Sequence, residues 1–197
     1  SEAASDQDHL RLIIDSNPHV PDRNRALAGT GESPGPHLAE TAAGLERAGA
    51  DVIVMACNAA HAWQPEIEAA ISVPFLSMID AVVQEALQHG PRRVGLLAAD
   101  ATIAADLYGR AFAAHGVAAV HPDQTRFMEL LYRIKSGDTG EGVQAGMRAL
   151  ADSLTDIDVL VAACTEVPLV LKEYHLPYID SSAALARAVV AFAPHGK

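Results

Sequence analysis

The chain has 197 residues, half of them hydrophobic, and a formal net charge of −11. This length and hydrophobic content predict a globular protein with one core or two small α/β lobes. The acidic balance, without any basic run, argues against a nucleic-acid partner. No apolar run reaches the roughly 18 residues that a membrane span needs, so we expect no membrane partner either.

The chain has only two cysteines, Cys57 and Cys164. They do not form a disulfide framework, and no Cys/His cluster has the spacing of a zinc site. Ser1–Asp8 is polar and has no apolar signal-peptide region. We therefore expect free thiols, no bound metal and a reducing cytoplasm.

The first half of the chain is predicted to be α/β, with a Pro-rich loop at 17–23 after its first strand. Its predicted strands are Leu10–Ile14, Asp51–Ala56 and Val73–Leu76. Its predicted helices are His37–Ala48, Ala59–Ala70 and Ala81–His89, two of them stopped by Gly49 and Gly90.

The second half continues the same alternation. Its predicted strands are Val94–Ala98, Val117–Val120, Ile157–Ala163 and Pro177–Ile179. Its predicted helices are Ile103–His115, Gln124–Lys135, Gly142–Leu154, a short helix from about Glu166, and Leu185–Phe192. Apolar strands without polar alternation, separated by helices, indicate parallel sheets covered on both faces.

An internal repeat relates the two halves. Asp51–Asn58 reads DVIVMACN and Asp158–Thr165 reads DVLVAACT. Aligned on the cysteines, the second half has four strands and the first only three, so the first lobe is predicted to lack its first strand. We expect two pseudo-symmetric lobes, 1–90 and 91–180, with 181–197 as a C-terminal helix packing back on the first.

The repeat places each cysteine where a strand gives way to a helix. Ligands of parallel α/β sheets bind beyond the carboxyl ends of the strands, and a following helix start favours a thiolate. Two facing thiols suit proton removal from one side of a carbon and proton return on the other, which inverts a stereocentre. The alternative is that Cys57 and Cys164 are ordinary buried cysteines. No lysine has a recognisable pyridoxal-phosphate setting, so hydrogen bonds and cations would stabilise the carbanion.

These motifs carry a family resemblance. Met55–His61 (MACNAAH) and Ala163–Pro168 (ACTEVP) resemble the two signature motifs of the cofactor-independent aspartate/glutamate racemases. Asp6–His9 and Asn17–Arg23 resemble the corresponding stretches of the aspartate racemase branch. The resemblance implies an isomerase without a cofactor, acting on aspartate, with Cys57 and Cys164 as acid/base residues; family members are commonly homodimers.

The resemblance also implies contacts with an acidic amino acid. Asn58 and Thr165 would hydrogen-bond its α-carboxylate or amine, and Arg23 and Lys135 would bind carboxylates. Each cation has a plainer alternative: Arg23 as a surface charge in a turn, and Lys135 as a favourable helix end.

Three further positions belong to the implied pocket. Thr102 would add a carboxylate contact, although it could instead cap a helix beginning at Ile103. Glu166 would lie near the substrate ammonium or Cys164, or be an ordinary first-turn charge. Ala59 stands where the family usually has threonine, so only its backbone N–H could serve there.

Several functions remain open at this stage. Within the superfamily they are glutamate or broad-specificity racemisation, hydantoin racemisation and maleate-type isomerisation. Malonate decarboxylation is disfavoured because that branch does not keep both thiols. From another class, the chain could be a non-catalytic protein that binds acidic ligands; Ala59 and the absence of the family's Gly-Gly-Met-Gly-type opening segment favour that alternative.

Overall fold

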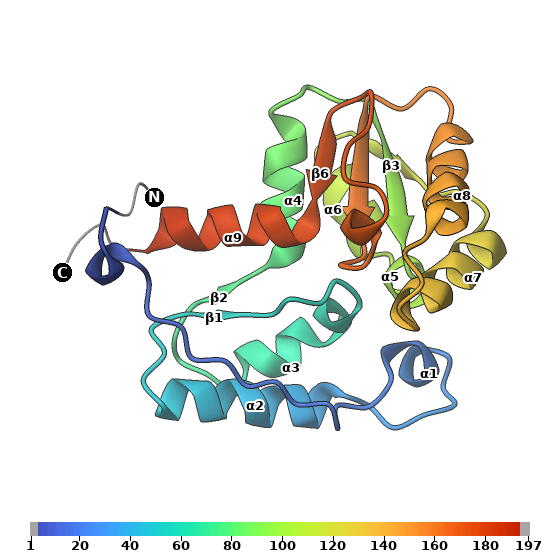
Figure 1. Cartoon of the computed structure of the whole chain (residues 1–197). Coiled ribbons are helices and arrows are strands. Elements are labelled where there is room, and N and C mark those ends of the chain that lie inside the picture. Colours follow the sequence, from blue (N-terminus) through green and yellow to red (C-terminus); the bar gives the residue numbers. More distant parts are fainter. Residues whose placement is uncertain (1–3, 194–197) are drawn as a thin grey trace.

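Two separate parallel sheets organise the chain in the computed structural model, which describes residues 4–193 (Figure 1). Residues 1–3 and 194–197, at the ends of the predicted first lobe and C-terminal segment, lie outside the described part. The strands, in chain order, are β1 (Ile53–Val54), β2 (Phe75–Leu76), β3 (Arg93–Ala98), β4 (Ala118–Val120), β5 (Val159–Ala163) and β6 (Tyr178–Asp180).

Helices separate the strands throughout. The short 3-10 helices are η1 (Asp6–Asp8), η2 (Ala59–Trp63) and η3 (Val167–Leu169). The α-helices are α1 (Arg23–Leu27), α2 (Gly35–Arg47), α3 (Gln64–Glu68), α4 (Met78–Leu87), α5 (Asp100–Ala104), α6 (Leu107–Ala113), α7 (Gln124–Lys135), α8 (Glu141–Asp152) and α9 (Ser181–Phe192).

The larger sheet has the strand order β4-β3-β5-β6, all parallel. Its central strand β5 is buried at every residue because side chains alternate between two covered faces. Leu160 and Ala162 join the core formed with α7 and α8, and Val161 points to the opposite core. The predicted apolar strands, buried on both sides, are confirmed here.

Helix α4 completes the second core although it precedes the expected boundary at Gly90. Its residues Ile79, Val82 and Ala86 pack with β3 and with α6. Helix α9 packs along α4 and also contacts β2, so it bridges the two sheets (Figure 1). A bidentate ion pair between Arg187 and Glu85 fixes the two helices at their surface.

The smaller sheet contains only β1 and β2, with Ile53 aligned to Phe75. Its core lies under α2 and α3, where Ala42, Ile53 and Ile67 are buried together. Within the described residues β1 pairs with β2 alone, whereas its repeat partner β5 pairs on both sides. One edge of β1 is therefore open.

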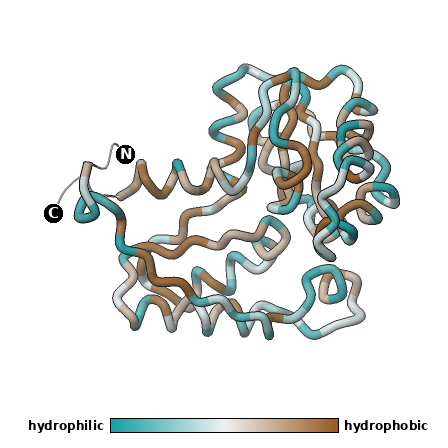
Figure 2. Tube along the Cα trace, in the orientation of Figure 1, coloured by the Kyte–Doolittle hydropathy of each residue, from teal (hydrophilic) through white to brown (hydrophobic). Residues whose placement is uncertain are grey.

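The predicted strand at Leu10–Ile14 is wrong. The segment has no regular secondary structure and pairs with no strand among residues 4–193, and Leu12 and Ile14 are 70% and 79% exposed. Figure 2 shows this hydrophobic stretch running past the smaller sheet. A cavity of about 180 Å³ lies beside β1 and is lined by Val54 and by Asp15, the residue that follows the segment. Within residues 4–193, β1 forms a ladder with β2 alone and not with this segment.

Two predicted helices are broken. The helix expected at 103–115 is two helices, α5 and α6, because Asp106 adopts a left-handed conformation with φ of 49°. The helix expected at 59–70 begins as the 3-10 helix η2 and continues as α3 from Gln64, whose Pro65 fits a helix start. The helices predicted at 37–48, 81–89, 124–135, 142–154 and 185–192 are confirmed to within a few residues.

The predicted fold class is confirmed: a mixed α/β protein with two small parallel sheets flanked by helices. Across residues 4–193, every helix is too short or too polar to cross a membrane. Because strands in both sheets are parallel, their carboxyl ends form two edges at which polar loops gather.

Candidate active site

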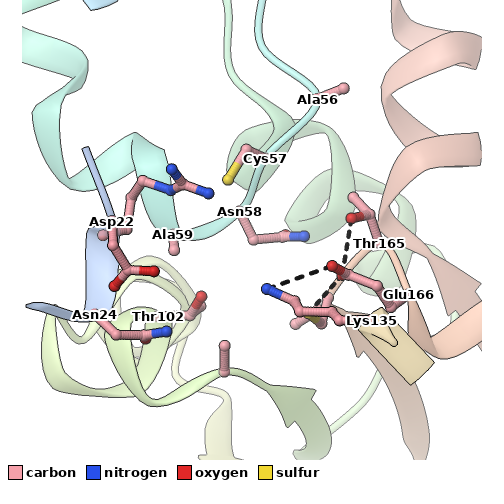
Figure 3. A pocket seen from close by; sticks show the side chains of 14 residues that line it. Asp22, Asn24, Ala56, Cys57, Asn58, Ala59, Thr102, Lys135, Thr165 and Glu166 are labelled. Atoms are coloured by element: carbon pink, nitrogen blue, oxygen red, sulfur yellow. Dashed lines mark hydrogen bonds and ion pairs between the residues drawn. The ribbon is translucent and has the colours of Figure 1, made fainter. Parts of the chain in front are cut away.

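A cavity of about 220 Å³ lies at the carboxyl ends of strands from both sheets (Figure 3). It is smaller than the roughly 300–1,000 Å³ typical of drug-sized ligands, which suits a small metabolite. All nine residues predicted from the sequence line it. They are Arg23, Cys57, Asn58, Ala59, Thr102, Lys135, Cys164, Thr165 and Glu166.

Cys57 enters the cavity from the turn between β1 and η2 and is half-buried. Buried His61, four residues further along the chain, stabilises the turn that carries Cys57. Its Nδ1 lies 2.8 Å from the Cys57 carbonyl oxygen, and its Nε2 accepts a hydrogen bond from the Met78 N–H at 3.0 Å. Because Nε2 accepts, the proton is on Nδ1, which donates to Cys57, and burial lowers the pKa of His61. His61 is thus a neutral support for the Cys57 backbone.

Cys164 enters from the equivalent position at the end of β5 and is buried. Its Sγ donates a hydrogen bond to Glu166 Oε2 at 3.1 Å, and Lys135 Nζ lies 3.5 Å from Glu166 Oε1. Burial, the negative charge of Glu166 and the hydrogen bond to it raise the pKa of the Cys164 thiol above its ordinary value. Cys164 therefore carries its proton at neutral pH.

Glu166 is the acceptor at the centre of this cluster. Thr165 Oγ1 also donates to its Oε2, at 3.0 Å. Burial raises the pKa of Glu166, but the hydrogen bond from Cys164, the charge of Lys135 and the bond from Thr165 outweigh it and leave that pKa lowered. Glu166 is thus a carboxylate that holds the Cys164 thiol at one oxygen and the Lys135 ammonium group at the other; Figure 3 shows Lys135, Thr165 and Glu166 in this cluster.

Thr102 is the third residue of α5, so it is not the helix cap that its alternative interpretation required. It is 2% exposed, and its Oγ1 has no hydrogen-bond partner in the described part of the chain. A buried hydroxyl without a partner is costly. Its position on the cavity wall makes a ligand oxygen the natural partner.

Helix α1 and its N-cap supply two lining residues that the sequence did not predict, Asn24 and Asp22, beside the predicted Arg23. Asp22 caps α1 by accepting from the Arg25 N–H at 2.8 Å, and Asn24 Oδ1 accepts from the Ala101 N–H at 3.0 Å. The second bond ties α1 to α5 across the cavity mouth. The signal was present in the polar run Asp22–Asn24. Three small residues complete the lining: Ala56, Ala99 and Ala163.

The charges of the cavity are mixed: Arg23 and Lys135 are cations, and Asp22 and Glu166 are acids. Such a wall suits a zwitterion that carries carboxylates and an ammonium group. Within residues 4–193, His, Cys, Asp and Glu side chains form no group of three or more that could hold a metal ion.

Known proteins match this chain along most of its length. The family model described as Asp/Glu/Hydantoin racemase matches residues 1–189. The aspartate racemase of Picrophilus torridus superposes with a TM-score of 0.88 and 33% identity, covering 96% of this chain and 82% of that protein.

Two curated relatives have different substrate ranges in their names. The broad specificity amino-acid racemase RacX of Bacillus subtilis (strain 168) is 31% identical over 151 residues, 74% of this chain and 66% of RacX. A glutamate racemase of Shewanella oneidensis is 28% identical over 166 residues, 78% of this chain and 59% of that enzyme. The chain thus spans just under two thirds of the length of the first relative and about three fifths of the length of the second.

Proposed function

Because the chain belongs to the Asp/Glu/Hydantoin racemase family, whose members are isomerases, we propose that it racemises aspartate by two-base proton transfer between Cys57 and Cys164, without pyridoxal phosphate. Other acidic or small amino acids are secondary substrates in this proposal, since relatives include glutamate and broad-specificity racemases.

One observation carries the proposal. The only two cysteines of the chain, at repeat-equivalent strand ends, line one cavity together with two cations. A racemase needs an acid and a base on opposite sides of one carbon, and two related halves supply one group each. An ordinary pair of core cysteines would have no reason to meet at a polar cavity.

The hydrogen bond from Cys164 to Glu166 supports one order of proton transfer. Cys164 is a thiol that donates to Glu166, so in this proposal it acts as the acid and Cys57 acts as the base. Cys57 takes the α-proton and the C–H electron pair stays on the α-carbon. The carbanion then takes the Cys164 proton on its other face. The product leaves a Cys57 thiol and a Cys164 thiolate, and the reverse reaction or solvent exchange restores the start.

The charges of the cavity support an acidic amino acid. Aspartate has two carboxylates for Arg23 and Lys135 and one ammonium group for Glu166 or Asp22. The hydroxyl of Thr102, which has no partner in residues 4–193, is a donor for a carboxylate oxygen. Placing cations near the α-carboxylate also stabilises the charge that develops when the α-proton leaves.

The test is exchange of the α-proton of L- and D-aspartate in heavy water, followed by NMR and chiral chromatography. We expect exchange with inversion in the wild type and loss of racemisation in Cys57→Ser and in Cys164→Ser, by about a hundredfold or more, since each removes one of two essential groups. Full racemisation by both single variants would refute the assignment. Tight binding of aspartate without exchange would instead favour the non-catalytic homologue, and parallel assays with glutamate decide between a narrow and a broad enzyme.

A further inference from the structure

The side chain of Asn58 is held by two residues outside the cavity lining. Tyr108 Oη, on α6, donates to Asn58 Oδ1 at 2.6 Å, and Asn58 Nδ2 donates to Ser181 Oγ, on α9, at 3.0 Å. Tyr108 is 1% exposed, Asn58 3% and Ser181 0%. A wholly buried polar chain thus connects the turn after β1 with two helices that pack on the larger sheet.

Burial decides the direction of the first bond. It raises the pKa of Tyr108, so the phenol keeps its proton and acts as a donor. No other partner of that hydroxyl is found in the described residues. If the Asn58 amide were turned over, the buried phenol proton would face an N–H₂ group and lose its acceptor. The amide oxygen therefore faces Tyr108, and the nitrogen faces the other way.

This orientation has a chemical result inside the cavity. An amide nitrogen carries two hydrogens, and Ser181 takes one. Figure 3 shows Asn58 reaching into the space between Cys57 and Thr165. The remaining N–H is a donor beside the proposed base, and its natural acceptor is a carboxylate oxygen.

We propose that Tyr108 is a positioning residue which, through Asn58, turns an amide donor toward the carboxylate next to the reacting carbon. The inference rests on the proposed function, since it names the element that orients one substrate contact. Tyr108 touches no ligand itself. Its effect is to remove the alternative orientation, in which the amide oxygen would face the carboxylate and repel it.

The variant Tyr108→Phe tests the inference with little change of shape. The ring stays packed on Phe112, with centroids 6.1 Å apart. We expect succinate, an unreactive dicarboxylate, to bind about tenfold more weakly, which is the loss of roughly one hydrogen bond. The matched control is Tyr178→Phe, which deletes a partly buried hydrogen bond from a tyrosine to the Leu171 carbonyl, at residues that do not line the cavity, and should leave binding unchanged.

A double-variant comparison separates positioning from general support of the fold. If Tyr108 acts through Asn58, the variant Asn58→Ala with Tyr108→Phe binds succinate no more weakly than Asn58→Ala alone. Losses that multiply, to about a hundredfold, would overturn the proposal. Calorimetry supplies the binding constants, and circular dichroism checks that each variant is folded.

Two further measurements keep the outcomes apart. In isotope-labelled wild type, the Asn58 side-chain amide signals should shift when succinate binds, and unchanged signals would overturn the inference without any variant. Aspartate racemisation is assayed on the same wild-type sample. If the effects of Tyr108→Phe and Asn58→Ala on succinate binding are not independent but the wild type does not racemise aspartate, the proposed function fails and the positioning role stands. If the wild type racemises aspartate but the two effects are independent, the positioning role fails and the proposed function stands.

Discussion

The Thr102 hydroxyl lowers the stability of the fold but is available to bind a ligand. It is buried on the cavity wall, and its Oγ1 has no partner in residues 4–193. An unpaired buried hydroxyl costs about 1–3 kcal/mol of stability. A side chain of the same shape without oxygen would relieve that cost and lose the contact with a ligand, as expected of a functional site.

We therefore expect Thr102→Val to raise the free energy of unfolding by about 1 kcal/mol and to weaken succinate binding by about tenfold. Chemical denaturation and calorimetry measure the two quantities. The exposed Thr155→Val is the control and should change neither. A variant that is both less stable and equally good at binding would show that Thr102 is only a structural residue.

The second residue-scale prediction concerns the thiol of Cys164. The negative charge of Glu166 and the bond it accepts contribute to the raised pKa. Removing the charge in Glu166→Gln makes the thiolate easier to form, so the pKa of Cys164 should fall and alkylation should begin at lower pH. The rate of alkylation against pH, measured in a Cys57→Ser background, follows this single thiol.

Glu129→Gln is the matched control, because Glu129 is an exposed carboxylate on α7 whose nearest ion pair is Arg126. It should leave the Cys164 profile unchanged. An unchanged profile in Glu166→Gln would mean that burial alone holds the proton on Cys164.

The site was largely predictable residue by residue. The repeated DVxV-x-A-C pattern places both thiols at strand ends, and the resemblance supplied positions as distant as Arg23 and Lys135. What it missed, Asn24 and Tyr108, act through side-chain bonds to segments distant in sequence. Such partners depend on tertiary packing, which local pattern does not contain.

At the scale of elements, the predictions failed where a single residue decides. The sequence predicts one helix at 103–115, and Asp106 divides it into α5 and α6 by adopting a left-handed conformation. Aspartate tolerates this conformation better than most residues. The interruption ends α5 at Ala104, and Thr102 of this short helix lines the cavity.

The stability of Asp106 variants should depend on how readily the new residue adopts the left-handed φ of 49°. Asp106→Gly should leave stability within about 1 kcal/mol of wild type, because glycine adopts this φ freely. Asp106→Val should lower the free energy of unfolding by about 1–2 kcal/mol, since a β-branched residue is strained there. Urea denaturation of the pair measures the difference, and equal stability of the two variants would contradict the backbone explanation.

The segment at 10–14 is predicted as a strand and forms none. Its short and mostly apolar run, Leu10–Ile14, predicts a strand, since such runs are a common strand signal. A strand also needs a neighbour at hydrogen-bonding distance, and within residues 4–193 this segment pairs with none. Pairing is a property of two segments, so the pattern of one segment alone could not decide it.

On the scale of the whole molecule, the repeat explains why the thiols meet and why the two sheets differ. Equivalent strands β1 and β5 bring one cysteine each to a shared cavity. Of these two strands, β5 has a neighbour on each side, whereas β1 pairs with β2 alone in the described residues. Most of the buried core packs on the larger sheet. The smaller sheet has a small core, and the turn after its strand β1 places Cys57 and Asn58 at the cavity.

The open edge of β1 has a consequence for colloidal behaviour. An exposed strand edge offers unpaired backbone groups to another molecule, and Val54 at this edge is 39% exposed. The net charge of −11 keeps copies of the chain apart at low ionic strength. Because salt screens that repulsion, light scattering should report association that grows with added sodium chloride.

Val54→Lys should suppress this association, whereas Tyr132→Lys, an equally simple change at an exposed site on α7, should not. If neither variant changes the association, its cause lies elsewhere on the surface. Storage at low salt, and a lysine at the edge, are then the practical means of keeping this protein in solution at high concentration.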